Sequence, residues 1–68
     1  MGIIKVIEVM ATSEKGWEEA TRNAVTHAAK TVKNIKSVYV NEMKASVSGD
    51  KVTDFLVNVK ISFELESK

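Results

Sequence analysis

The longest regular pattern in the chain covers residues 51–66, where apolar and polar side chains alternate with period two. One set of alternate residues is mostly apolar: Thr53, Phe55, Val57, Val59, Ile61, Phe63 and Leu65. The other set is mostly polar: Val52, Asp54, Leu56, Asn58, Lys60, Ser62 and Glu64. A β-strand sends successive side chains to opposite faces, so the pattern predicts one strand with an apolar and a polar face. Residues 52–65 would span about 46 Å, so this strand must be bent, paired beyond its own subunit, or both.

Two shorter segments predict two further strands. Residues 3–11 carry apolar side chains on both sides, which is typical of a strand that is buried on both faces or lies at a subunit contact. Residues 35–47 predict a second strand, which leads through Gly49-Asp50 into the long strand. Gly-Asp is a two-residue hairpin signal of the II′ kind, with glycine at the first central position. The second and third strands are therefore expected to pair antiparallel.

Between the first two strands, residues 16–32 predict an amphipathic helix. Thr12 and Ser13 are candidate N-caps, and Asn34 is a candidate C-terminal stop. The stripe at three- and four-residue spacing consists mainly of small residues: Trp17, Ala20, Thr21, Ala24, Ala28, Thr31 and Val32. Small side chains let a helix lie close to a sheet, so we expect this helix to cover one sheet face, with the indole at one end.

The hairpin turn fixes the expected pairing of the second and third strands. One face, which we expect the helix to cover, carries the pairs Val40–Val59 and Val38–Ile61. The expected pairs on the other face are Met43–Leu56, Asn41–Asn58, Tyr39–Lys60 and Ser37–Ser62. A mixed face with isolated large side chains is typical of ligand sites and subunit interfaces. The candidate binding residues on this face are Ser37, Tyr39, Asn41, Met43, Leu56 and Asn58.

The order strand, helix, strand, strand predicts an α+β fold, β-α-β-β: a three-stranded antiparallel sheet with one helix packed on one face. We expect residues 1–68 to form a single domain, with the first strand beside the long third strand. A domain of this length has a marginal core, which small proteins usually support with disulfides, a metal or oligomerisation. The chain has no cysteine and only one histidine, His27, so oligomerisation is the expected support.

Charge and composition exclude several partners. Ten Lys and Arg residues against nine Asp and Glu residues give a net charge of +1, which does not favour nucleic acid or an anionic membrane surface. No apolar run has the length of a transmembrane helix. The N-terminal MGIIKVIEVM lacks the features of a signal peptide, so a cytoplasmic location is expected.

No catalytic constellation is visible in the sequence, so we do not expect an enzyme. There is no nucleophile motif, P-loop or dinucleotide fingerprint, and His27 has no histidine or cysteine partner. The carboxylates are scattered without EF-hand spacing, and solvated strand faces are their simplest interpretation. The basic cluster Lys30, Lys33 and Lys36 could contact a phosphate, although cations near a helix C-terminus need no ligand to explain them.

Four segments together resemble the dodecin family: KVIEV at 5–9, ATSEKGWEEA at 11–20, AAKTVKNI at 28–35 and VKISFEL at 59–65. The resemblance covers essentially the whole chain. It implies a hollow spherical homododecamer whose strongly bent sheet partly wraps the helix. Many dodecins bind riboflavin, FMN or FAD as stacked pairs between subunits, and they store or sequester the flavin. Others bind coenzyme A, or lack flavin sites and hold cations.

The resemblance also places two flavin-binding positions on this sequence. Flavin-binding members use a tryptophan early in the second strand to stack on the ring, and that position falls on Ser37. They use a glutamine in the third strand to bind the polar edge of the ring, and that position falls on Leu56. Trp17 belongs to the helix motif and does not replace the stacking residue. The expected function is therefore a dodecin-like shell in which flavin binding is weakened or lost.

Two alternatives remain open at the level of sequence. The first is a dodecin that binds a divalent cation or coenzyme A. The second is a purely structural assembly, in which the face carrying Ser37 and Leu56 is subunit interface. In each case the expected partner is further copies of the same chain.

Overall fold

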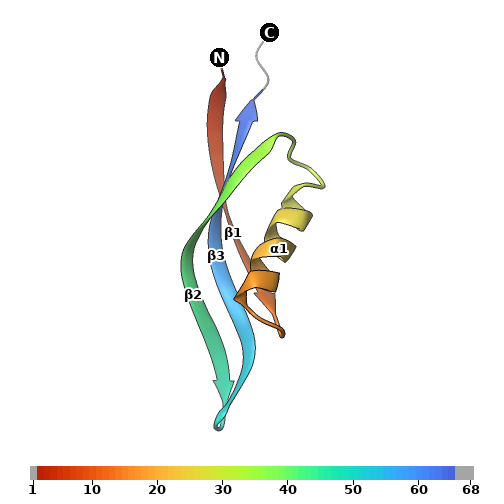
Figure 1. Ribbon diagram of the computed structural model, residues 1–68. Helices are drawn as coiled ribbons and strands as arrows, with labels where there is room; N and C mark the ends of the chain where they lie inside the picture. Colours follow the sequence, from red (N-terminus) through yellow and green to blue (C-terminus); the bar gives the residue numbers. More distant parts are fainter. Residues whose placement is uncertain (1, 66–68) are drawn as a thin grey trace.

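Three strands and one helix make up the computed structural model, which describes residues 2–65 (Figure 1). Strand β1 (Ile3–Ser13) is followed by helix α1 (Trp17–Ala28) and by strands β2 (Ile35–Ser48) and β3 (Lys51–Leu65). The strands form one antiparallel sheet in the order β1-β3-β2. The α+β class, the β-α-β-β order and the position of the first strand beside the third are confirmed. Glu66, the last residue of the predicted long strand, lies outside the described residues.

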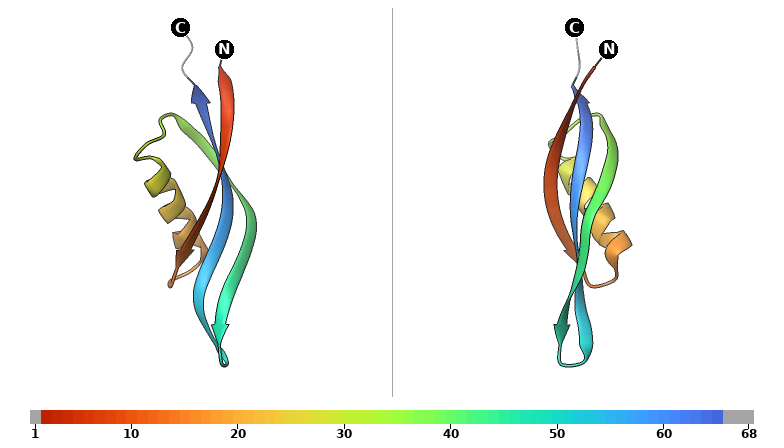
Figure 2. Two further views of the ribbon diagram at one scale, coloured as in Figure 1. Left: turned by 180° about the vertical axis from the view of Figure 1, so that it is seen from behind. Right: turned by 90° about the vertical axis from the view of Figure 1, so that its left-hand side faces the viewer.

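The sheet is strongly bent, and α1 lies against one of its faces (Figure 2). Val57, Val59 and Ile61 of β3 are completely buried there. The facing surface of the helix consists of three buried alanines, Ala20, Ala24 and Ala28. Residues of β1 and β2 complete this core from both sides: Ile7, Val9, Ala11, Ile35 and Val38, with Val25 of the helix. The small stripe seen in the sequence is thus the surface that brings helix and sheet together.

The helix is shorter than predicted and is capped differently. It ends at Ala28 instead of residue 32, because the N–H groups of Lys30 and Thr31 bond to carbonyls three residues back and tighten the chain into a turn. The predicted N-caps are wrong: Gly16 occupies that position, and the helix has no side-chain cap. Ser13 instead accepts a hydrogen bond of 2.9 Å from the backbone N–H of Lys15.

Asn34 ends the segment between helix and β2 in a left-handed conformation, with φ of 64°. Its side-chain amide donates to the carbonyl of Glu64 at 3.4 Å, and its own carbonyl accepts from the N–H of Glu64 at 3.0 Å. Asparagine tolerates this conformation better than most residues. The residue therefore turns the chain into β2 and fastens that turn to the end of β3.

The β2–β3 hairpin turns at Gly49, where φ is 65°, while Asp50 keeps a negative φ. A positive φ at the first central residue alone fits the II′ turn expected from the sequence. Ser48 pairs with Lys51, and Val47 pairs with Val52. The turn and the first pairs of the predicted register are therefore confirmed.

Three irregularities interrupt the register of the hairpin, and the first two from the turn change the predicted pairs. Thr53 is an extra residue on β3, between the pairs Val47–Val52 and Ser46–Asp54. Asn41 is an extra residue on β2, between the pairs Glu42–Asn58 and Val40–Val59. The second bulge cancels the first, so the predicted pairs Tyr39–Lys60, Val38–Ile61 and Ser37–Ser62 are also confirmed. Between these two bulges the register is shifted by one residue, and a third irregularity follows at Lys36, between the pairs Ser37–Ser62 and Ile35–Phe63.

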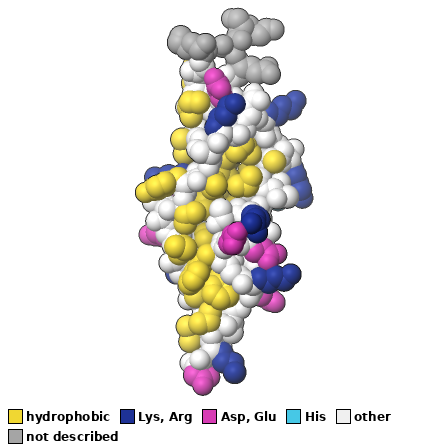
Figure 3. Space-filling view, viewed as in Figure 1, with side chains coloured by type: hydrophobic (Ala, Val, Ile, Leu, Met, Phe, Trp, Pro, Cys, Tyr) yellow, Lys and Arg dark blue, Asp and Glu magenta, His cyan; other side chains and the backbone are white. Residues whose placement is uncertain are grey.

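The hairpin projects beyond the helix as an arm, which makes the molecule long and thin. Its principal extents are 55, 19 and 13 Å, and its radius of gyration is 14.1 Å, against about 11 Å for a compact chain of this length. The accessible surface of 5129 Å² exceeds the about 4,200 Å² typical of a compact 7.5 kDa monomer. Apolar side chains form a stripe along much of its length (Figure 3).

Candidate functional site

The candidate residues belong to the sheet face that α1 leaves uncovered, which we call the outer face. On β3 it consists of Leu56, Asn58, Lys60 and Ser62, because these alternate with the buried residues of the core. The strand pairings place three rows across the sheet on this face: Thr12–Leu56–Lys44, Met10–Asn58–Glu42 and Glu8–Lys60–Tyr39. A fourth row, Val6–Ser62–Ser37, lies beyond them.

The bulges change the pairing of two of the six candidates. Met43 was predicted to face Leu56, but it pairs with Val57 and so lies on the side of the sheet that α1 covers. Its side chain is 60% exposed there, because it lies on the arm beyond the helix. Asn41 was predicted to face Asn58, but it is the bulged residue, and Glu42 pairs with Asn58 instead. A one-residue shift moves every side chain between the bulges to the other face.

Ser37 and Leu56 lie on the same face but not at the same place. Ser37 pairs with Ser62, and their hydroxyl oxygens are 2.5 Å apart. Ser62 and Leu56 are six residues apart on β3, which corresponds to about 20 Å along a strand. A flat ligand in contact with Leu56 therefore cannot reach Ser37 of the same copy. Any site that uses both positions needs residues from more than one copy.

Leu56, Asn58 and Tyr39 form the part of the candidate set that one copy does bring together. They occupy three successive rows of the outer face, with Leu56 and Asn58 half-buried and Tyr39 65% exposed. The Oδ1 atom of Asn58 is shielded from solvent and has no hydrogen-bond partner. Unpaired buried acceptors are uncommon in folded proteins. The centre of the outer face is therefore polar, incompletely satisfied and bordered by a large exposed ring.

The candidate set from the sequence omits three residues that share these rows. Met10 of β1 pairs with Asn58 and is 57% exposed, while Lys60 lies between Glu8 and Tyr39. Glu42 lies in the row of Asn58 only because Asn41 is the extra residue of a bulge. The position of β1 beside β3 was predicted, so its alternation could have identified Met10. No local sequence signal marks the bulge that brings in Glu42.

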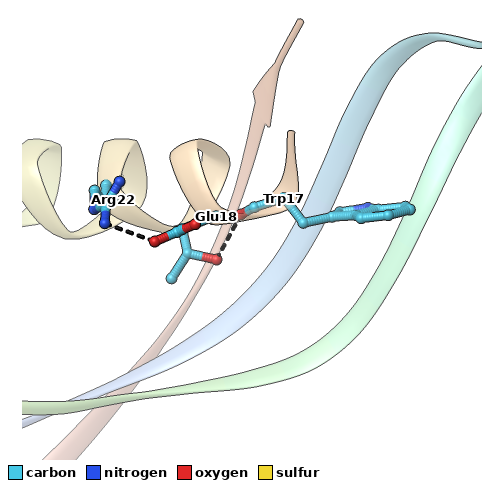
Figure 4. Close-up of polar contacts among 4 residues, drawn as sticks. Trp17, Glu18 and Arg22 are labelled. Carbon is cyan, nitrogen blue, oxygen red and sulfur yellow. Dashed lines mark hydrogen bonds and ion pairs between the residues drawn. The ribbon is translucent and has the colours of Figure 1, made fainter. Parts of the chain in front are cut away.

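Trp17 lies outside the outer face and has a structural role. Its indole Nε1 donates a hydrogen bond of 3.0 Å to the carbonyl of Lys44 on the arm. Its ring also meets Phe55 edge-on at 4.9 Å between centroids. Figure 4 shows the indole extending away from the helix axis toward β2 and β3. The nearby Glu18–Arg22 ion pair is exposed at both ends and contributes little stability.

A cleft lies at the C-terminal end of the helix. It is an open cleft of about 460 Å³ lined by Thr31, Val32, Lys33, Asn34, Phe63, Glu64 and Leu65. Lys33 could attract an anionic ligand to this cleft, but the carboxylate of Glu64 also lines it and would repel such a ligand. Glu64 forms an ion pair of 3.8 Å with Lys36. Of the basic cluster Lys30, Lys33 and Lys36, only Lys33 thus lines the cleft.

Neither a metal centre nor a membrane span is formed by the part of the chain that the structure describes. Within residues 2–65, no three His, Asp or Glu side chains come together as a set that could hold a metal ion. No helix among those residues is both long and apolar enough to cross a bilayer.

Comparisons with known proteins connect this geometry to one family. The family model described as Dodecin matches residues 3–66. A protein named Dodecin from Thermus thermophilus is 30% identical over 64 residues, covering 94% of this chain and 93% of that protein. Calcium dodecin from Mycobacterium tuberculosis is 33% identical over 66 residues, covering 96% and 92%.

Solved structures agree with the sequence relatives. A crystal structure of a Thermus thermophilus protein covers the whole of both chains with a TM-score of 0.93 at 28% identity. The crystal structure of the Mycobacterium tuberculosis calcium dodecin, which is described as calcium-chelating with a novel calcium-binding site, gives a TM-score of 0.81 at 29% identity. That match covers 94% of this chain and 91% of the other.

Proposed function

Because the chain belongs to the dodecin family, we propose that it assembles into a hollow homododecamer that binds and stores, or sequesters, a small molecule and catalyses no reaction. One observation carries this proposal: the two positions that flavin-binding relatives use lie far apart in a single copy. Ser37 and Leu56 share the outer face but are about 20 Å apart, so a ligand that uses both positions must lie between copies.

The exposed surface of the single chain supports assembly. Its accessible area exceeds that of a compact monomer of equal mass by about 900 Å². Large apolar side chains are more than half exposed on both faces of the sheet: Ile3, Ile4, Val6, Met10, Met43, Val47 and Val52. A stable protein–protein contact buries about 800 Å² on each partner, so the excess is large enough for subunit contacts.

Flavin binding is weak or absent in this proposal. Ser37 offers no ring on which a flavin could stack, which removes about 0.5–1.5 kcal/mol beyond the loss of buried area. Leu56 offers no amide to the polar edge of the ring, and each ring group left dry and unpaired costs about 1–3 kcal/mol. Tyr39 lies two residues beyond Ser37 on the same face and supplies a displaced ring.

The experiment that tests this proposal introduces the stacking ring and the amide that flavin-binding relatives use. Titration of the Ser37→Trp/Leu56→Gln double variant with riboflavin, followed by quenching of flavin fluorescence, is expected to give binding at least about tenfold tighter than that of the unaltered protein. Thr26→Trp, which adds a tryptophan on the exposed side of the helix, is the matched control and is expected to leave riboflavin binding unchanged. Tight binding of paired flavins by the unaltered chain would contradict the proposal.

A divalent cation is the second candidate ligand, favoured by the 33% identity to a protein named Calcium dodecin. Within residues 2–65 no single-copy carboxylate cluster exists, so a cation would have to be held by residues of several copies. Calcium analysis of the dialysed assembly, with calorimetric titration of calcium and coenzyme A, distinguishes this candidate from flavin. A purely structural assembly would bind none of the three.

A further inference from the structure

Uncharged side chains lie together on one side of the hairpin arm. Met43 pairs with the buried Val57, which places it on the sheet face that α1 covers nearer the middle of the sheet. Alternate residues of β2 after Met43 stay on that face, and so do the β3 residues that pair with them. We call this set the arm patch: Met43, Ala45, Val47, Val52 and Phe55. Figure 3 shows apolar side chains continuing along the arm beyond the helix.

The opposite side of the same hairpin segment is polar. It carries Glu42, Lys44, Ser46 and Asp54, together with Leu56. Neither strand contributes a charged side chain to the arm patch. A lack of charge combined with methionine and aromatic side chains is typical of the core of a protein–protein interface. The two sides of the arm are therefore built for different surroundings, one for solvent and the other for a contact.

The bulge at Asn41 determines which side of the arm is apolar. Val40 pairs with the buried Val59, so unbroken alternation along β2 would bring Glu42 and Lys44 to that face and turn Met43 away from it. The extra residue reverses this arrangement and continues the apolar face of the core onto the arm.

A single copy gains little burial from this arrangement. Met43, Val47 and Val52 remain 60%, 65% and 53% exposed, because they lie beyond the end of the helix. Trp17 borders the patch, since its ring packs edge-on against Phe55, and it is also 38% exposed. A contact outside the copy would bury these side chains and so explain why the arm turns them to one side.

We infer that the arm patch is buried against a second copy of this chain. The inference rests on the proposed assembly and names a surface through which the copies join. The excess accessible area of about 900 Å² is close to the about 800 Å² that each partner buries in a stable contact. The uncharged patch also matches what a second copy offers, because Ile4, Val6 and Met10 are more than half exposed on its outer face.

Two charge substitutions on adjacent residues of the arm test this inference. Native mass spectrometry over a range of chain concentrations measures the concentration at which half of the chains are assembled. Val47→Asp is expected to raise this concentration at least about hundredfold, because assembly must then bury an unpaired carboxylate. Ser46→Asp puts the same charge on the polar side of the arm and, as the matched control, is expected to change the concentration by less than about threefold. Circular dichroism of both variants checks that the chain still folds.

Oxidation of Met43 tests the patch without a substitution. Hydrogen peroxide transfers one oxygen atom to an exposed thioether, which gives a sulfoxide and water. In the intact assembly Met43 is expected to react at least about tenfold more slowly than free N-acetylmethionine amide, since a second copy covers it. If Val47→Asp fails to fold, this oxidation rate decides the question.

The failure of this inference differs from the failure of the proposed function. A folded Val47→Asp chain that assembles like the unaltered protein would overturn the inference and leave the proposed shell standing. Oxidation of Met43 in the intact assembly at the rate of the free compound would do the same. An unaltered chain that does not assemble would contradict the proposed function itself.

Discussion

Trp17 connects the start of the helix to the hairpin arm through two contacts. The indole N–H reaches the carbonyl of Lys44, and the ring packs edge-on against Phe55. The side chain lies at one end of the helical stripe, as the sequence predicts, and is 38% exposed. Its position explains how a helix of twelve residues can support an arm that projects beyond it.

Trp17→Phe isolates the hydrogen bond from the packing. Phenylalanine keeps an aromatic ring beside Phe55 but cannot donate to Lys44. The free energy of unfolding in urea, measured at matched chain concentration, is expected to fall by about 1 kcal/mol. Trp17→Ala removes both contacts and is expected to cost about 3–5 kcal/mol. Equal losses for the two variants would show that the ring contact with Phe55 contributes nothing.

At the scale of elements, the close approach of helix and sheet depends on alanine. Ala24 is 2% exposed and faces a sheet surface whose three central residues are completely buried. Any larger side chain at this position must push the helix away from β3. The small side chains of the stripe are therefore required by the packing of the helix on the sheet, and the high helix propensity of alanine alone does not explain them.

Ala24→Leu is expected to destabilise the protein by about 1–3 kcal/mol through overpacking, with a lower urea midpoint at equal chain concentration. Thr26→Leu makes a side chain of the same final size on the exposed side of the helix and is expected to change stability by less than about 0.5 kcal/mol. If both variants unfold at the same midpoint, the helix does not lie as close to the sheet as described.

The elements themselves were predictable because their signals are periodic and extend over many residues. The alternation of β3, the alanine stripe and the Gly49 turn each indicate their structure locally. The bulges at Asn41 and Thr53 could not be predicted, because each is compensated by the other and leaves the flanking register intact. They changed the predicted pairing of two of the six candidates, Met43 and Asn41, and moved Met43 to the other face. The shortened helix was missed because Thr31 and Val32 continue its apolar spacing after the backbone has left it.

At the scale of the whole molecule, three features of a single copy favour assembly with further copies. It buries only six apolar residues fully within the described chain, exposes an arm with bare apolar side chains, and divides its candidate binding positions between distant rows. Each of these features is explained if further copies cover the arm and complete the site. The long strand that seemed too large for a chain of 68 residues is then the element that serves both the core and its neighbours.

The native mass of the purified chain tests this account most directly. Native mass spectrometry is expected to show twelve copies of the 7.5 kDa chain, about 90 kDa, as one closed assembly, together with any small molecule that it retains. A mass equal to one or two chains at the same concentration would contradict the account, because neither the exposed arm nor the divided site could then be completed.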